Sequence, residues 1–206
     1  MGACGFQILQ GLPSHIADMA RCHGSCFPDQ FMSRMGLRYT EAFYRRYLDE
    51  PKGVAFVAVD DRGTVIGLVV GGDGGIRSRF LRSAWWRHAP CFLIRFLTNS
   101  FIRRKVLAAV WSRPRGSGAS DASNPPASDL SGAALLQVIC VEEAWRGTPV
   151  ATGLLEAFTD RCRKAGYAGI VLAVSAENER AIRFYARNQW SILRRTPPSV
   201  WMQRTL

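Results

Sequence analysis

The N-terminal part of the chain combines one short apolar run with two segments of helical periodicity. Phe6–Leu9 predicts a short strand. Ser14–Cys26 places apolar residues on one helical face and starts with a residue type that commonly caps helices, so we expect a helix with Ser14 as its N-cap. Met32–Leu48 repeats apolar and aromatic positions at helical spacing and predicts a second, longer helix.

Two apolar runs then predict a β-hairpin. Val54–Val59 is continuously apolar, which is typical of a strand covered on both faces. Asp60–Gly63 has the composition of a tight turn, and Thr64–Val70 is the expected return strand. The glycine-rich stretch Gly71–Gly75 is expected to end this strand.

The C-terminal part alternates strands and helices. Leu135–Val141 is an apolar strand candidate, and a helix is expected from about Pro149 to Ala165. A further apolar run precedes a short helix that begins near Glu177.

Two closing strands are expected at Trp190–Leu193 and Val200–Gln203, with a turn at Arg194–Ser199 between them. The order of elements predicts an α/β (α+β) fold, in which a sheet carries helices on both faces. The 206 residues are expected to form a single domain, 1–206, because a chain of this length can bury a core of its own.

Residues 73–132 differ from the rest and are interpreted as a basic helical insertion. Ten of them are Lys or Arg and three are Asp, so this segment carries +7 of the net charge of +11. A transmembrane helix is disfavoured, because each central cation costs about 2.5–3.5 kcal/mol on insertion scales. The favoured interpretation is an insertion packed on its own domain with a solvated basic face. The alternative is a helix, within 76–113, that lies on an anionic membrane surface. Nucleic-acid binding ranks lower, because no recognisable module is present.

The six cysteines predict no metal site. Cys22-His23-x-x-Cys26 is the only close cluster, and a structural zinc site usually needs a second close pair. We therefore expect reduced, buried thiols in a reducing compartment. The N-terminus lacks the pattern of a signal peptide, so a cytoplasmic protein is expected.

A turn between the strand at Leu135–Val141 and the next helix has the features of an anion site. Arg146 and Gly147 open the turn, and Gly147 lets the backbone approach a ligand closely. Pro149 suits an early helical position, where its missing N–H costs the helix nothing. The free N–H groups and the dipole of a helix start favour a phosphate group.

The short helix near Glu177 carries polar groups on one face. Asn178, Ala181 and Tyr185 are spaced three and four residues apart, so they lie on the same side of a helix. An amide and a phenol there can address a ligand bound between the two neighbouring strands. The simpler interpretation is a helix-capping Asn and a core Tyr.

Together the two motifs resemble the acyl-CoA-binding core of the GCN5-related N-acetyltransferase (GNAT) superfamily. Arg146-Gly-Thr-Pro149-Val-Ala151 stands where that family has Gln/Arg-x-x-Gly-x-Gly/Ala. Asn178-Glu-Arg-Ala181-Ile-Arg-Phe184-Tyr185 matches its Asn-x-x-Ala-x-x-Phe-Tyr pattern in full. The resemblance implies a mixed, mostly antiparallel sheet flanked by helices. The departure is Pro149, which replaces the middle Gly and removes one backbone donor.

The resemblance also implies roles. Two strands would splay at Val141, and the amides of Ile139 and Val141 would bind the pantetheine arm and the oxyanion. Tyr185 would protonate the departing thiolate as the general acid. The residues implied in binding acetyl-CoA are Ile139, Cys140, Val141, Arg146, Gly147, Thr148, Pro149, Val150, Ala151, Thr152, Asn178, Ala181 and Tyr185.

The resemblance implies N-acetylation of a primary amine by acetyl-CoA. A basic and aromatic acceptor side, formed by Phe27–Tyr47 and the insertion, favours a small-molecule amine with phosphates, such as a nucleotide- or lipid-linked amino sugar. Glu142, Glu143 and His88 are the candidate bases, and deprotonation by water is an acceptable alternative. A different interpretation is a non-catalytic CoA-binding or membrane-adaptor protein, based on Pro149 and the insertion.

Overall fold

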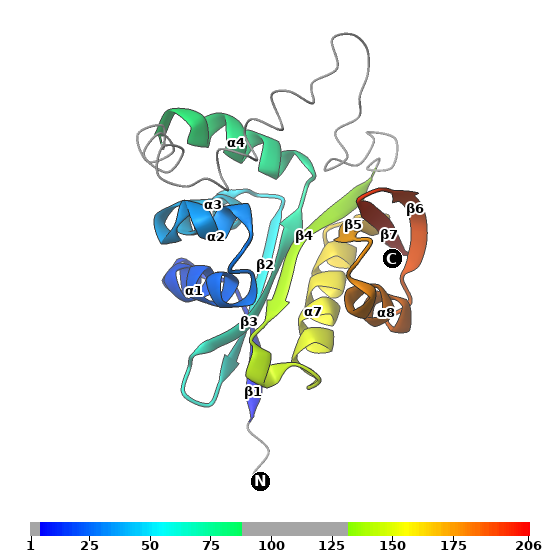
Figure 1. Cartoon of the computed structure of the whole chain (residues 1–206), viewed down its shortest axis with the longest axis horizontal. Coiled ribbons are helices and arrows are strands. Elements are labelled where there is room, and N and C mark those ends of the chain that lie inside the picture. Colours follow the sequence, from blue (N-terminus) through cyan, green and yellow to red (C-terminus); the bar gives the residue numbers. More distant parts are fainter. Residues whose placement is uncertain (1–4, 88–131) are drawn as a thin grey trace.

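The protein is built around one mixed sheet of seven strands, in the order β1-β2-β3-β4-β5-β7-β6 (Figure 1). The computed structural model describes residues 5–87 and 132–206. The strands are β1 (Phe6–Gln10), β2 (Gly53–Asp60), β3 (Val65–Gly72), β4 (Ala133–Val141), β5 (Gly169–Ser175), β6 (Ser191–Thr196) and β7 (Ser199–Thr205).

Helices cover both faces of the sheet, with α1, α2 and α3 on one face and α7 and α8 on the other (Figure 1). Two short 3-10 helices, η1 and η2, precede α1 and α7. The bounds are η1 (Pro13–His15), α1 (Ile16–Cys26), α2 (Phe31–Met35), α3 (Leu37–Asp49), α4 (Gly75–Arg87), η2 (Glu143–Trp145), α7 (Val150–Lys164) and α8 (Glu179–Arg187).

The strand pairing is mostly antiparallel, as the resemblance implied. Each neighbouring pair from β1 to β4 is antiparallel, and so are β5 with β7 and β7 with β6. Only β4 and β5 run parallel. The α/β (α+β) class expected from the order of elements is therefore confirmed.

The core has two layers because successive side chains of a strand point to opposite faces. On one face, Leu68 and Cys140 pack with α1 and α3. On the other face, Val69 and Val141 pack with α7 and α8. Every residue of β3 is buried, which explains why this strand and its neighbours read as continuous apolar runs.

The helix expected over Met32–Leu48 is two helices, α2 and α3. Gly36 separates them with a φ of +97°, a conformation that side chains other than Gly rarely adopt. The apolar spacing continues across this break, so periodicity alone did not reveal it.

The expected N-cap at Ser14 is also wrong. Residues Pro13–His15 form η1, and α1 begins only at Ile16. His15, rather than Ser14, makes the local side-chain contact, because its Nδ1 accepts from the N–H of Leu12 at 3.2 Å.

Two strands run longer than the turn signals indicated. Gly71 and Gly72 still pair with Val54 and Gly53, so the glycine-rich stretch ends β3 two residues later than expected. Gly71 lies so close to β4 that a Cβ would stand 2.3 Å from the Leu135 carbonyl oxygen, which explains the absence of a side chain there. Cross-strand pairing likewise extends β6 through Arg194–Thr196, which the sequence assigned to a turn.

The start of the basic insertion is helical, as expected. In α4, Ile76 and Phe80 are buried, and the Phe80 ring packs edge-on against Tyr39 and Phe43 of α3. Arg79 forms ion pairs with Glu50 and Asp73. The rest of the expected helical insertion, residues 88–131, lies outside the described residues.

No helix in residues 5–87 or 132–206 is long and apolar enough to cross a membrane. Ile76 and Phe80 of α4 pack in the cluster that contains α3. The structure gives no support to the membrane contact considered for 76–113.

Three buried tyrosines make the fold sensitive to alkaline pH. Burial raises the pKa of Tyr44, Tyr47 and Tyr185 above the ordinary value of 10.0. The unfolded chain therefore ionises these phenols before the folded chain does, and stability that is present below pH 10 falls as the pH rises further.

We expect the free energy of unfolding to fall by about 1.4 kcal/mol per pH unit for each such tyrosine above that pH. Urea unfolding at a series of alkaline pH values measures the slope. The Tyr47→Phe variant should show a shallower slope than the wild type, and an equal slope in both proteins would contradict the assignment.

Candidate active site

The strands β4 and β5 separate along most of their length. Their parallel pairing covers only Ala133–Leu135 on β4, opposite Gly169–Val171 on β5. The splay therefore begins after Leu135. The resemblance placed it at Val141, six residues further along the strand. The remaining part of β4 is paired on its β3 side alone, which leaves one backbone edge facing the gap.

Backbone alternation decides which amides face that gap. The N–H of Glu142 donates to the Ile66 carbonyl oxygen at 2.8 Å, so Glu142 points toward β3. In an antiparallel pair, neighbouring residues point their backbone groups in opposite directions. The N–H groups of Ile139 and Val141 therefore point away from β3 and toward β5. The binding role that the resemblance implied for these two amides needs this direction.

Cys140 lies between these two residues and differs from them. Its backbone groups point toward β3, and its side chain packs in the cluster that contains α1 and α3. The structure therefore does not bring Cys140 to the face that carries Ile139 and Val141.

The anion-binding turn is exposed and leads directly into α7. Gly147 has a φ of +84°, and no atom lies within 4 Å of the position that a Cβ would occupy. Pro149 is the N-cap of α7, one residue before the helix, and its carbonyl oxygen accepts from the N–H of Gly153 at 2.9 Å. Pro149 thus costs the loop one donor while still starting the helix.

Local hydrogen bonds shape this loop. The Thr148 hydroxyl donates to the Trp145 carbonyl oxygen at 2.7 Å and accepts weakly from the N–H of Val150 at 3.5 Å. Ala151 and Thr152 stand in the first turn of α7, where N–H groups have no partner inside the helix. Together with the N–H of Gly147, these groups can bind a phosphate.

Arg146 is fixed beside the end of β4. Its Nε donates to the Val141 carbonyl oxygen at 3.4 Å, and its guanidinium lies 3.9 Å from Glu143. This arrangement places a positive charge next to the loop and the β4 edge.

The second motif lies on α8, as predicted. Asn178 is the N-cap, and its Oδ1 accepts from the N–H of Ala181 at 3.0 Å. Tyr185 is 6% exposed, and its ring packs against Trp190 with centroids 5.4 Å apart. Asn178 and Tyr185 therefore have the structural roles that the simpler interpretation assigned to them.

The two motifs nevertheless meet in one buried cluster. Val141, Val150 and Tyr185 are buried members of it, and Ile139 and Ala181 pack against them. The end of β4, the start of α7 and the buried face of α8 therefore lie on the same side of the sheet.

The Tyr185 phenol carries its proton at neutral pH, because the ordinary pKa of a tyrosine, about 10, lies well above that pH. Desolvation raises the pKa of its hydroxyl further. The group is therefore available as a proton donor to a departing thiolate.

The candidate bases have different surroundings. Glu142 forms an ion pair with Arg21 at 2.7 Å, and the Glu143 side chain is 91% exposed. His88 lies outside the described residues. The structure therefore brings neither glutamate into the buried cluster.

A groove of about 630 Å³ lies elsewhere, among α1, α2 and α3. It is lined by none of the residues expected to bind acetyl-CoA. Its lining residues are Ala20, Gly24, Ser33, Gly36, Leu37, Arg38, Thr40 and Glu41.

Comparison with known families identifies the fold and the two motifs together. Residues 16–189 match the model of the acetyltransferase (GNAT) family. The chain belongs to this family. The match contains β4, the loop before α7 and all of α8, so the resemblance drawn from the motifs is confirmed.

Solved GNAT structures share the whole fold at low sequence identity. A GNAT-family acetyltransferase from Staphylococcus aureus Mu50 is 12% identical, with a TM-score of 0.58 and coverage of 98% of this chain and 99% of that chain. The PaiA N-acetyltransferase from Thermoplasma acidophilum, in complex with coenzyme A, is 9% identical, with a TM-score of 0.61 and the same coverage. No curated protein sequence matches this chain.

This GNAT protein is therefore an acyl-CoA-dependent acetyltransferase, and its cosubstrate is acetyl-CoA. The non-catalytic interpretation based on Pro149 loses its support. The loop keeps the N–H groups of Gly147, Ala151 and Thr152, so the fold does not depend on a Gly at position 149 to present donors.

Sequence reasoning missed one feature near this site. Cys22 and Cys26 were considered without a partner, but the structure brings Cys140 from β4 next to them. The only available signal was a Cys in a strand expected to be central, and its partner is more than a hundred residues away in the chain.

We expect Gly147→Ala to weaken coenzyme A binding about tenfold, because a left-handed backbone with a Cβ costs about 1–2 kcal/mol and the loop would relax away from it. Calorimetric titration with coenzyme A measures the change.

Gly166→Ala is the matched control. Gly166 has a φ of +78° and equally open surroundings, but it lies after the opposite end of α7. This variant should lose similar stability with unchanged coenzyme A affinity, and equal affinity losses in both variants would contradict the assigned role of the loop.

Proposed function

We propose that this GNAT protein acetylates the primary amine of a small molecule by direct attack on acetyl-CoA. The observation that carries the proposal is that the open edge of β4, the loop that leads into α7 and Tyr185 on α8 lie on one side of the sheet. These parts supply, respectively, donors for a thioester carbonyl, donors for a pyrophosphate and a proton for a leaving thiolate.

In the proposed reaction, the neutral amine nitrogen attacks the thioester carbonyl carbon. The developing oxyanion accepts hydrogen bonds from the N–H groups of Ile139 and Val141, which point into the gap between β4 and β5. Such preorganised donors favour the transition state over the ground state, because negative charge grows on the oxygen during attack.

Collapse of the intermediate forms the amide and breaks the C–S bond. The sulfur takes its proton from the Tyr185 hydroxyl, and the attacking nitrogen loses a proton to water. Because Glu142 is paired with Arg21 and Glu143 is exposed, water is the preferred acceptor of this second proton.

For the acceptor, we infer a primary amine that carries phosphate, such as a nucleotide- or lipid-linked amino sugar. The support is electrostatic: the chain carries a net charge of +11, and α3 and α4 contribute many of its cations. They include Arg38, Arg45, Arg77 and Arg82, whereas Arg46 and Arg79 form ion pairs with Glu50 and Asp73. A polycationic amine would be repelled by the same surface.

We expect Tyr185→Phe to lower kcat about 100-fold or more, because general acids typically contribute 10²–10⁴ to the rate. The dissociation constant for coenzyme A should change little, since the ring and its packing against Trp190 are kept. Thiol release and calorimetry measure the two quantities separately.

Tyr167→Phe serves as the matched control, because Tyr167 is a part-buried tyrosine that lies outside both motifs, and its hydroxyl donates to the carbonyl oxygen of Lys52, just before β2. Its kcat should equal that of the wild type. A Tyr185→Phe enzyme with wild-type kcat would rule out Tyr185 as the acid.

Acceptor choice is tested with a pair of amines that differ only in phosphate. We expect a nucleotide-linked amino sugar to have a KM at least about tenfold below that of the free amino sugar, with the difference shrinking as salt is added. Equal KM values at low salt would refute the phosphate preference without affecting the acetyltransferase assignment.

A further inference from the structure

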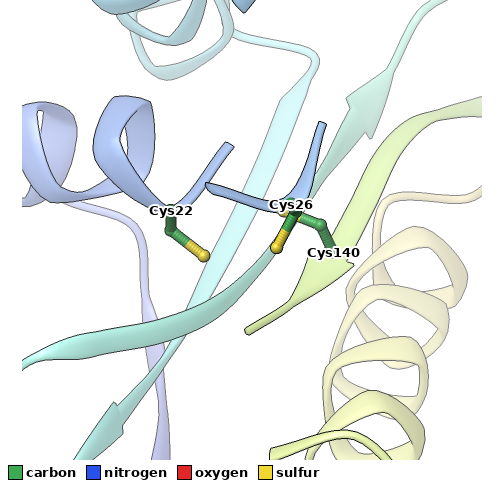
Figure 2. Close-up of side chains that lie close together, drawn as sticks. All are labelled: Cys22, Cys26 and Cys140. Carbon is green, nitrogen blue, oxygen red and sulfur yellow. The ribbon is translucent and has the colours of Figure 1, made fainter. Parts of the chain in front are cut away.

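Three cysteines from two distant segments converge between α1 and β4. Cys22 and Cys26 come from α1, and Cys140 comes from β4 (Figure 2). Their three sulfur atoms all lie within 4.8 Å of one another. We searched residues 5–87 and 132–206 for three or more His, Cys, Asp or Glu side chains whose ligand atoms lie close enough to share one metal ion, and these three cysteines form such a group.

Local geometry explains the convergence. Residues four apart lie on the same face of a helix, so Cys22 and Cys26 both face the sheet. Cys140 faces α1 because its neighbours in β4 face α7. Arg21 holds the two elements together by an ion pair with Glu142 and a hydrogen bond to the Val65 carbonyl oxygen at 2.9 Å.

The cluster is shielded from solvent, and its thiols interact. Cys22 is 0% exposed and Cys140 is 6% exposed, while Cys26 is partly exposed. Hydrogen bonds with Cys140 and Cys22 lower the pKa of Cys26, and the same contacts raise the pKa of Cys140.

His23 does not belong to the cluster, although it stands between two of its members in the sequence. Its Nδ1 lies 2.6 Å from the Tyr44 hydroxyl oxygen, and its ring packs edge-on against Phe27. The site therefore offers sulfur alone.

We propose that Cys22, Cys26 and Cys140 form a binding site for a thiophilic metal ion, Zn²⁺ or Cu⁺. Soft thiolate ligands select these ions over the harder Mg²⁺ and Ca²⁺. Tetrahedral zinc with bonds of about 2.3 Å would set the sulfur atoms about 3.8 Å apart, a spacing compatible with three sulfurs that already lie within 4.8 Å. Each thiol that is protonated beforehand releases its proton as its metal–sulfur bond forms.

Three features favour a metal ion over a disulfide. A disulfide joins two sulfurs and leaves the third unused, whereas one ion uses all three. Two of the ligands have the four-residue helical spacing that metal sites use to chelate an ion. The third ligand comes from the adjoining strand, as in sites that join separate elements of a fold.

Bound metal would connect α1 to the strand that faces acetyl-CoA. Cys140 is adjacent in sequence to both Ile139 and Val141, so an ion held there would restrain the backbone that carries their amides. The proposed metal site does not depend on the proposed reaction, because metal binding is measured without acetyl-CoA or an amine.

The test uses reduced, chelator-treated full-length protein under anaerobic conditions. Titration with Co²⁺, a spectroscopic probe for zinc sites, should produce a sulfur-to-metal charge-transfer band that saturates at one ion per chain. Added Zn²⁺ should abolish the band. In a second arm, competition with a coloured Cu⁺ chelator measures Cu⁺ affinity, and the two arms decide which ion the site prefers.

Cys22→Ser and Cys26→Ser should each weaken metal binding by more than about tenfold, since even the loss of a supporting contact typically costs 10–100-fold. Cys162→Ser is the matched control, because Cys162 is 0% exposed and lies on α7, outside the cluster. Its affinity should equal that of the wild type. Thermal unfolding checks that each variant is folded, and Cys26, being partly exposed, is the position more tolerant of serine.

Two results would overturn the proposal. One is the absence of both a charge-transfer band and Cu⁺ retention in the reduced wild type. The other is a metal affinity that neither Cys22→Ser nor Cys26→Ser changes. If the reduced protein binds no metal and oxidation removes two thiols from the wild type but none from Cys22→Ser, the cluster is a disulfide site instead.

Discussion

The incomplete pairing of β4 with β5 is the constraint on which the rest of the site depends. Three residue pairs hold the strands together, and beyond Leu135 they part. A strand with one unpaired edge presents N–H groups that require a partner when they are covered. In a GNAT fold, the thioester arm of acetyl-CoA is suited to supply that partner. The other edge of β4 pairs with β3 from Leu135 to Val141, apart from one register shift opposite Val70 and Gly71.

This constraint also divides the functions of β4 between its two faces. Ile139 and Val141 direct their amides to the gap and their side chains to the α7 and α8 layer. Cys140 directs its side chain to α1, where it meets Cys22 and Cys26. A single strand thus connects the proposed cosubstrate side of the sheet to the thiol cluster on the other face.

Capping and packing account for the second motif without any ligand. The side chain of Asn178 caps α8, and Tyr185 packs against Trp190 in the core. These structural roles do not compete with the proposed ones, because the cap uses only the Asn178 oxygen and the packed Tyr185 ring leaves the phenol protonated at neutral pH. Pro149 likewise has two effects: it removes one N–H donor from the loop, and it is the N-cap of α7.

Sequence alone determined the order of elements, the two motifs and the family, because periodicity, turn composition and short-range spacing are local properties. It could not detect the break at Gly36 or the extension of β6 through Arg194, because backbone conformation and cross-strand pairing decided these. It placed the splay at Val141, whereas the tertiary structure placed it after Leu135, because the point of separation depends on how two distant strands pack against α7. The meeting of Cys140 with Cys22 and Cys26 was likewise decided only by the fold, which brings together side chains that sequence spacing does not relate.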